Sequence, residues 1–384
     1  MAFNVLFIDD DIFMLRALQR TAVRLRPDDN FIMCNQETAW QNTLSAGMVP
    51  DAVFCDYLMP LKNGDKVLKE IEHIHPSAVR ILLTGNTTED VISSVSNVAH
   101  FVLSKPFVDD DLNYVFSCLE RLNALMLSPK IRNEVGRHSY FFSLPETTVK
   151  IQRLFSQPEM NITEAANLIE QDSVVTAKII QLANSAFLGY RRHTTSLTEA
   201  LKRLGLRLAE AIVVSISIEQ RMLGTVSAQV HKRCSDWAYR YATACRQNSK
   251  LLGFNTEMQD LISVAALLTG LGHFVVAADY PDYTPDSHQA PINFDVGLSA
   301  DPVTLRAVFL LTLWGFSFDL CEIISQQDTP DLVAADGDEP MLNLVMFVSK
   351  LALNKKVNSE SLLMLKSRIK SKAVIDWLDK VLAD

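Results

Sequence analysis

Four short apolar runs in the first third of the chain each end in side chains that could do chemistry. The runs are residues 5–8, 52–55, 80–83 and 101–104. The groups that follow them are, in order, the pair Asp9 and Asp10, then Asp56, Thr84 and Lys105. Clustered carboxylates either raise a pKa or hold a hard cation, and an oxygen-only set with one or two acids suits Mg²⁺.

These groups match what phosphoryl transfer to a carboxylate requires. Asp56 is already ionised at neutral pH, so it needs no general base to act as a nucleophile. Thr84 can donate a hydrogen bond to a phosphoryl oxygen, and the Lys105 ammonium can neutralise its charge. Asp56 alone would be explained equally well as a helix cap or turn residue, which is common after strands. The four other groups favour the chemical interpretation.

Alternating strands and helices must bring these groups together. Over residues 1–125, apolar strand-like runs alternate with helical periods. This alternation is typical of a parallel sheet with helices on both faces, in which ligands bind at the carboxyl ends of the strands. We expect strands at residues 3–8, 31–34, 52–55, 80–83 and 101–103. We expect helices at 12–25, 38–45 and 65–74, one that starts near Thr88, and a last one with Asp109 as its N-cap.

Five features in this order resemble the receiver domain of two-component response regulators. They are Phe7-Ile8-Asp9-Asp10-Asp11, Cys55-Asp56-Tyr57-Leu58-Met59-Pro60, Gly64, Leu82-Leu83-Thr84-Gly85 and Lys105-Pro106-Phe107. The resemblance implies a flavodoxin-like α/β fold with a five-stranded parallel sheet. It implies that Asp56 is the phosphoacceptor, and that Asp10, Asp56 and the carbonyl of Leu58 bind Mg²⁺, with Asp9 acting through water.

The resemblance also implies roles for the remaining groups and for a partner. Thr84 and Lys105 would stabilise the phosphoryl group and start the switch, and a sensor histidine kinase or phosphotransfer protein would donate it. The family usually has an aromatic residue three positions before the lysine. Val102 stands there in this chain, with Phe101 beside it, so either Phe101 replaces the usual aromatic or the coupling is smaller.

Beyond Pro129 strand-like runs nearly vanish and helical periods dominate. We therefore expect a receiver at residues 1–125, a linker at 126–135, an all-α domain at 136–335 and a helical extension at 336–384. The expected helices are 145–155, 162–170, 173–187, 197–204, 206–222, 230–252, 257–278, 303–314, 318–326, 341–353 and 361–382.

Motifs in this second part resemble the HD-related output domain, HDOD, which is related to HD-type metal phosphohydrolases. They are Ser143-Leu144-Pro145, Asp172, Asn184-Ser185, Arg203-Leu204-Gly205 and Trp314-Gly315-Phe316. HD-type enzymes hold metal with neighbouring His and Asp, but Thr269-Gly270 stand in that place and glycine offers no ligand. The resemblance therefore implies a non-catalytic output that binds a signalling partner. His273 is interpreted as a core or surface residue, and Asn184 and Ser185 as helix-terminating residues rather than partner contacts.

The composition excludes several other classes of protein. The net charge is −9 and no basic patch recurs, so no nucleic-acid partner is expected. The six cysteines are far apart and the start of the chain has no signal-like pattern, which favours a reduced cytoplasmic protein. The longest apolar run, residues 307–318, is too short to span a bilayer, so no membrane association is expected.

One alternative function remains open, and so does the oligomeric state. It is a metal-dependent HD-type phosphohydrolase or cyclic-dinucleotide phosphodiesterase with an atypical site. A transcription factor would need a basic recognition helix, and residues 197–204, with Lys202 and Arg203, are too slight for one. The last receiver helix could pair with a second copy to form a homodimer, or dock on the domain that follows.

Overall fold

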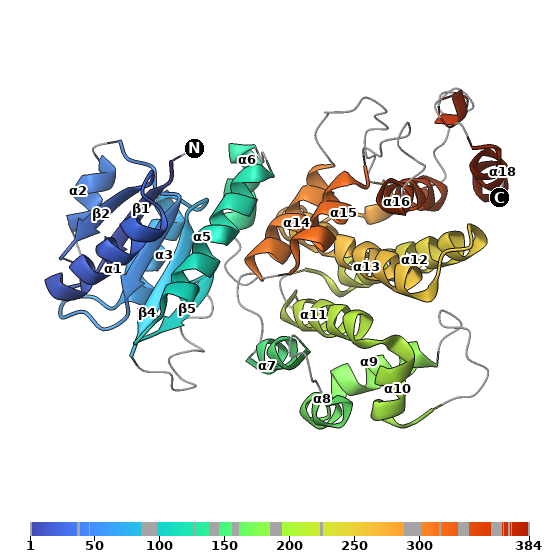
Figure 1. Cartoon of the computed structure of the whole chain (residues 1–384), viewed down its shortest axis with the longest axis horizontal. Helices are drawn as coiled ribbons and strands as arrows, with labels where there is room; N and C mark the ends of the chain where they lie inside the picture. Colours follow the sequence, from blue (N-terminus) through green and yellow to red (C-terminus); the bar gives the residue numbers. More distant parts are fainter. Residues whose placement is uncertain are drawn as a thin grey trace. The chain divides into compact units, whose positions relative to one another are not determined.

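The chain folds as two compact units in the computed structural model (Figure 1). The first comprises Met1–Ser143 with the segment Phe309–Gly315, and the second comprises Leu144–Val308 and Phe316–Asp384. The structure describes residues 2–36, 39–45, 47–85, 98–125, 128–137, 146–155, 161–184, 194–222, 226–287, 301–314, 316–328, 338–354, 363, 365–367, 369 and 371–382. The helix expected near Thr88, the Ser143-Leu144-Pro145 motif, Ser185 and Gly315 lie outside the described residues.

The first unit is built on a parallel sheet of five strands in the order β2-β1-β3-β4-β5. The strands are β1 (Asn4–Ile8), β2 (Asn30–Cys34), β3 (Ala52–Asp56), β4 (Val79–Thr84) and β5 (Phe101–Ser104). The helices between and after them are α1 (Ile12–Leu25), α2 (Ala39–Ser45), α3 (Gly64–Ile74) and α5 (Asp109–Ala124). This confirms the predicted doubly wound, flavodoxin-like fold.

Successive residues of β1 point to opposite faces of the sheet and so build two separate cores. Leu6 and Ile8 pack in a cluster that includes Trp40 of α2 and Leu68 of α3. Phe7 lies between these two residues and points the other way, into a group of aromatic rings completed by Phe31, Phe54 and Phe116. Because both faces of the central strands β1, β3 and β4 are covered, these strands are mostly apolar and buried, as is typical of parallel sheets.

The last receiver helix begins differently from the prediction. Asp109 is its first helical residue, and the N-cap position is taken by Val108. The backbone N–H of Val108 donates to the carboxylate of Asp111 at 2.9 Å. The sequence offers three consecutive acids here, and the one three positions after the cap has the reach to satisfy an otherwise unpaired N–H.

Residues expected as a linker include a short helix, α6 (Pro129–Gly136), that packs on the first unit. Its Ile131 and Val135 are buried, and a side chain at Gly136 would meet the carbonyl of Pro76 at 1.9 Å. The fully buried Arg80 of β4 donates to the carbonyl of Gly136 at 3.3 Å. We infer that this part of the expected linker belongs structurally to the receiver.

The second unit is helical throughout its described residues. Its first helices are α7 (Glu146–Phe155), α8 (Ile162–Ile169), α9 (Ser173–Ala183), α10 (Leu197–Leu204) and α11 (Leu206–Met222). They are followed by α12 (Ala228–Leu251), α13 (Thr256–Asp279), a short 3-10 turn (Pro285–Ser287), α14 (Pro302–Leu313), α15 (Phe318–Gln326), α16 (Asp338–Asn354) and α18 (Lys372–Leu382). The residues of α14 from Phe309 onward are counted with the first unit. The single helix predicted at 361–382 is wrong in extent: α18 begins at Lys372, and Ile369 and Ser371 are not helical.

Helix α13 is the central element of the second unit. Glycines let two neighbouring helices approach it, since a side chain at Gly270 would lie 2.4 Å from the side chain of Ala238 in α12, and one at Gly272 would lie 2.0 Å from the carbonyl of Val303 in α14. Among the described residues, α13 alone is long and apolar enough to cross a membrane by length and composition, and 89% of its apolar window is buried in the structure. It therefore has the character of a core helix.

We predict that Arg80→Met frees α6 from the receiver. The Arg80 side chain also donates to the carbonyls of Val98, Pro76 and Ala78, so its loss leaves buried acceptors unpaired. Hydrogen exchange should speed up across residues 129–136, and the unfolding free energy should fall by about 3–5 kcal/mol. Arg24→Met, which removes an exposed ion pair with Asp109, is the matched control. Unchanged exchange in Arg80→Met would show that α6 is held by other contacts.

Candidate functional site

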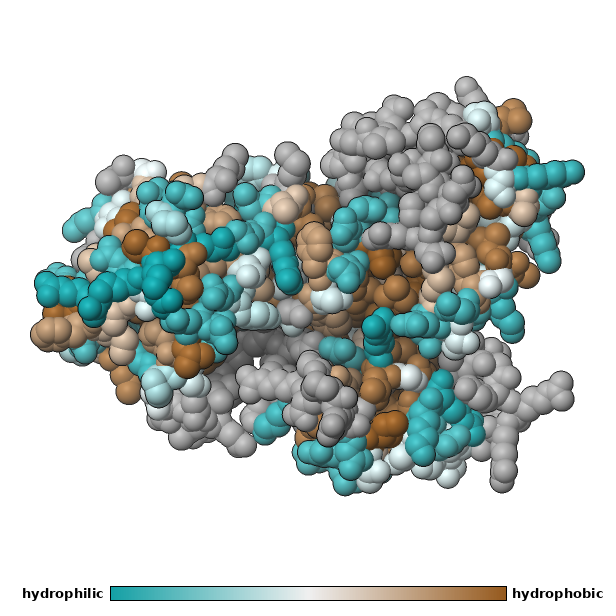
Figure 2. All heavy atoms as spheres, viewed as in Figure 1, coloured by the Kyte–Doolittle hydropathy of each residue, from teal (hydrophilic) through white to brown (hydrophobic). Residues whose placement is uncertain are grey.

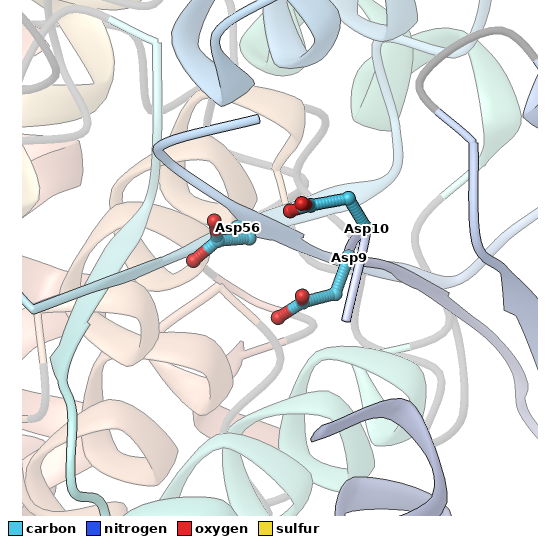
Figure 3. Close-up of side chains that lie close together, drawn as sticks. All are labelled: Asp9, Asp10 and Asp56. Carbon is cyan, nitrogen blue, oxygen red and sulfur yellow. The ribbon is translucent and has the colours of Figure 1, made fainter. Parts of the chain in front are cut away.

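The pairing of the strands places the three acids at one edge of the sheet. In β1 and β3, Ile8 pairs with Cys55, so Asp9 and Asp56 follow side by side. Carboxylate oxygens of Asp9, Asp10 and Asp56 lie within 4.8 Å of one another. Figure 3 shows the three side chains together at the ends of these two strands. Within the described residues this is the one group of three or more His, Cys, Asp or Glu side chains close enough to share a metal ion.

Lys105 reaches the same cluster from the end of β5. Its Nζ lies 2.5 Å from Oδ1 of Asp56 and 2.9 Å from Oδ2 of Asp9. Its backbone N–H donates to the carbonyl of Thr84 at 2.7 Å, which fixes the ends of β4 and β5 relative to each other. The ammonium therefore bridges the two buried carboxylates, while Asp10 is exposed.

The cluster has more negative than positive charge, but burial has the largest effect on the pKa of Asp56 and of Lys105. Burial raises the pKa of Asp56, the Lys105 ammonium opposes this shift, and the charges of Asp9 and Asp10 add to it. Burial lowers the pKa of Lys105, but its hydrogen bonds to Asp56 and Asp9 outweigh this and leave the pKa raised. A divalent cation would relieve the repulsion among the carboxylates, so the oxygen-only donor set fits Mg²⁺.

Local backbone features hold the two loops that carry the acids. The carboxylate of Asp11 caps α1 by accepting from the N–H of Phe13 at 2.8 Å, and Asp9 accepts from the N–H of Asp11 at 2.8 Å. A side chain at Gly64 would lie 2.0 Å from the carbonyl oxygen of Asp56. Only glycine therefore lets α3 begin so close to the end of β3.

The other residues named from the sequence lie around the cluster. Thr84 is buried at the end of β4, and Leu58 follows Asp56 with its side chain 61% exposed. Val102 is 37% exposed. Phe101 packs edge-on against Tyr114 of α5, with ring centroids 5.9 Å apart. The aromatic ring at the start of β5 is therefore already in contact with the last receiver helix.

The sequence did not reveal the direct contact between Asp9 and Lys105. The resemblance gave Asp9 a role through water, whereas the structure places its carboxylate 2.9 Å from the ammonium. Residues 96 positions apart give no local signal of such a contact. The strand order would have suggested it, because β1 and β5 both end at this edge of the sheet.

The polar residues singled out in the helical unit have structural partners. The Asn184 side chain donates to the carbonyl of Thr194 and accepts from its N–H, at 2.7 and 2.8 Å. Asp172 accepts from the N–H of Val175 at the start of α9. His273 is buried, with its Nδ1 2.5 Å from the hydroxyl of Tyr283. These contacts agree with the helix-terminating and core interpretations.

The position expected for the metal-binding His–Asp pair is buried and polar. The hydroxyl of Thr269 donates to the carbonyl of Ala265 at 2.8 Å, one turn back in α13. The same hydroxyl accepts from Nε2 of Gln327 at 3.1 Å, and Oε1 of Gln327 accepts from the hydroxyl of Tyr241 at 2.6 Å. A network of neutral side chains therefore occupies this place.

Two family models match the chain. The response regulator receiver domain matches residues 5–116, and the HDOD domain matches residues 142–330. Together they cover most of the chain. Their boundaries lie on either side of α6.

The curated relatives and the solved structures each match about a third of the chain. A hydrogenase transcriptional regulatory protein, HoxA, from Cupriavidus necator is 32% identical over 112 residues, which is 28% of this chain and 22% of that protein. An uncharacterized protein from Treponema pallidum is 27% identical over 139 residues, 36% of this chain and 26% of that protein. This chain thus spans about a quarter of the length of the curated relatives that it matches.

Among solved structures, the signal receiver domain of an HD domain-containing protein from Pseudomonas fluorescens is 26% identical and has a TM-score of 0.29. That match covers 31% of this chain and 86% of that one. CheY4 of Vibrio cholerae, a chemotaxis response regulator, is 18% identical, with a TM-score of 0.28 over 31% of this chain and 99% of that one. The family models and the parallel sheet agree, and the chain belongs to the two-component response regulators, as a receiver domain joined to an HDOD domain.

Proposed function

We propose that Asp56 accepts a phosphoryl group in a reaction that depends on Mg²⁺. The observation that supports this most is the meeting of Asp9, Asp10, Asp56 and Lys105 at one sheet edge. Asp10, Asp56 and the carbonyl of Leu58 would hold the ion, with Asp9 acting through water. The ion would neutralise charge on the phosphoryl oxygens.

The side chains of this chain supply the remaining parts of the reaction. The oxygen of the Asp56 carboxylate that does not hold the ion attacks phosphorus. The bond from phosphorus to the donor breaks, and the donor leaves with that electron pair. Lys105, already beside Asp56, pairs with a phosphoryl oxygen as the negative charge grows. Thr84 donates its hydroxyl proton in a hydrogen bond to another of these oxygens.

A sensor histidine kinase or a phosphotransfer protein is the donor that we propose. Several large apolar side chains are exposed on the loops and helix start next to the acids: Phe13 by 75%, Leu61 by 82% and Val108 by 62%. Exposed apolar side chains next to an active carboxylate fit the docking of a partner protein. Small acyl phosphates could reach the same carboxylate without docking.

Phosphorylation would act through the ends of β4 and β5. The added charge draws Thr84 and Lys105 toward the phosphoryl group, and these residues start the loops on either side of β5. Phe101 already contacts Tyr114 of α5, so we propose it in place of the usual switch aromatic, since Val102 has no ring. The exposed face of α5 would then pair with a second copy or dock on the output domain.

For the HDOD domain we propose a non-catalytic output that binds a signalling partner in the cytoplasm. The buried network around Thr269, in the place of the His–Asp pair, supports this. The alternative is an HD-type phosphohydrolase or cyclic-dinucleotide phosphodiesterase with an atypical site. Turnover of a cyclic dinucleotide by the purified chain, above a heat-denatured control, would favour that alternative.

We predict that a small acyl phosphate adds about 80 Da to the chain in the presence of Mg²⁺, the mass of a phosphoryl group. Asp56→Asn should abolish the gain, because the amide cannot act as the nucleophile. Excess chelator should also abolish it. Intact-mass spectrometry is the measurement, and a gain that persists in Asp56→Asn would show that another residue is phosphorylated.

We also predict that Asp10→Ala lowers the Mg²⁺ affinity of the receiver by at least about tenfold, because it removes a direct ligand. Asp11→Ala is the matched control, since Asp11 caps α1 and lies outside the cluster. That variant should lose about 1 kcal/mol of stability while it keeps its Mg²⁺ affinity. Equal affinities in both variants, measured by titration of Mg²⁺, would contradict the assignment of Asp10.

A further inference from the structure

The second unit contains a buried cluster of one lysine and two aspartates. Lys350 lies in α16, Asp301 directly precedes α14, and Asp328 follows α15. All three are buried, with exposures of 4%, 1% and 4%. The Nζ of Lys350 lies 2.6 Å from Oδ1 of Asp328 and 3.1 Å from Oδ2 of Asp301. Because α16 lies beyond residue 330, the cation comes from outside the segment that matches the HDOD model.

The polar atoms of this cluster satisfy one another. The third N–H of the ammonium can reach the hydroxyl of Thr304 at 3.3 Å. The other carboxylate oxygens accept from backbone N–H groups, Asp301 from Val303 at 3.0 Å and Asp328 from Asp301 at 3.2 Å. Burial lowers the pKa of Lys350, but the two carboxylates outweigh this and leave it raised, so the lysine stays charged.

The cluster continues into the network at the place of the missing His–Asp pair. The hydroxyl of Thr304 lies 3.5 Å from Nε2 of Gln327, which donates in turn to Thr269. The ammonium thus sits among two carboxylates and a hydroxyl, which are the hard oxygen ligands that Mg²⁺ and Mn²⁺ prefer. The position between the two carboxylates, where such an ion could bind, is occupied by the ammonium of Lys350.

We propose that Lys350 is an internal counter-cation, whose ammonium holds the position that a divalent metal ion would take between Asp301 and Asp328. This goes beyond the proposed phosphotransfer, because it concerns only the second unit and holds whether or not Asp56 is phosphorylated. The helices after residue 330 complete the domain, since without Lys350 the two buried carboxylates would lose the ammonium that both of them contact.

The test uses the full chain with Asp10→Ala and Asp56→Asn, so that the receiver cluster does not take up metal. In this background Lys350→Met should lower the Tm of the second unit by about 6–20 °C, the scale expected when one partner of a buried ion pair is removed. Lys366→Met is the matched control, because it breaks a partly exposed pair with Asp379. It should shift Tm by no more than about 2–4 °C.

Binding of Mn²⁺ then tests whether the Lys350 ammonium occupies a position that a divalent cation could take. Lys350→Met should bind a single Mn²⁺ per chain, detected by electron paramagnetic resonance, and recover most of the lost Tm, whereas the background chain with Lys350 should bind none. Adding Asp328→Asn to Lys350→Met should remove that binding. Failure of Lys350→Met to bind Mn²⁺, or equal binding when Asp328→Asn is present, would overturn the proposed position.

Two further comparisons keep the test decisive if Lys350→Met does not fold. Refolding it with and without Mn²⁺ should give soluble chain only with the metal. The variant that combines it with Asp301→Asn and Asp328→Asn removes the buried charge and should fold without metal. If that variant is no more soluble than Lys350→Met alone, the lysine is needed for packing rather than for charge, and the proposal is wrong.

Discussion

The receiver depends on the attraction between one ammonium and two buried carboxylates, together with the repulsion from a third. Lys105 bridges Asp56 and Asp9, while Asp10 adds a negative charge that it does not neutralise. A parallel sheet creates this arrangement, because all its strands deliver their last residues to one edge. The excess charge is a cost to the fold, and a divalent cation at this edge would relieve it.

The second unit contains a similar group of one lysine and two buried aspartates, but the balance of charges differs. Lys350 also contacts two buried aspartates, no third acid joins them among the residues that the structure describes, and backbone N–H groups satisfy the remaining carboxylate oxygens. The first cluster keeps one exposed carboxylate, that of Asp10. In the second cluster all three charged residues are buried, as is typical of a structural cluster.

The sequence predicted the five strands and the fold of the receiver, because its signals are local. Apolar runs that end in Asp9, Asp56, Thr84 and Lys105 specify both the strands and the edge at which they end. The cap of α5 was mispredicted, since three successive acids compete for one position and only the backbone geometry selects Asp111 as the acceptor.

The contacts between distant residues could not be predicted in this way. Arg80 reaches Gly136 across 56 positions, and Lys350 reaches Asp301 across 49. A single charged residue inside an apolar strand or helix was the available signal in both cases, because such a residue must find a buried partner. The sequence does not say which partner it finds, since that depends on how the helices pack.

We propose that burial and the excess negative charge at the sheet edge prepare Asp56 for a cation and a phosphoryl group. A pH titration of the ¹³C-labelled side-chain carboxyl of Asp56 by NMR, with and without Mg²⁺, tests it most directly. We expect a pKa above the ordinary aspartate value in the metal-free protein, because burial and the neighbouring acids disfavour the charged form. Mg²⁺ should lower that pKa. A carboxyl that titrates at or below its ordinary value without metal, and does not respond to Mg²⁺, would contradict the account.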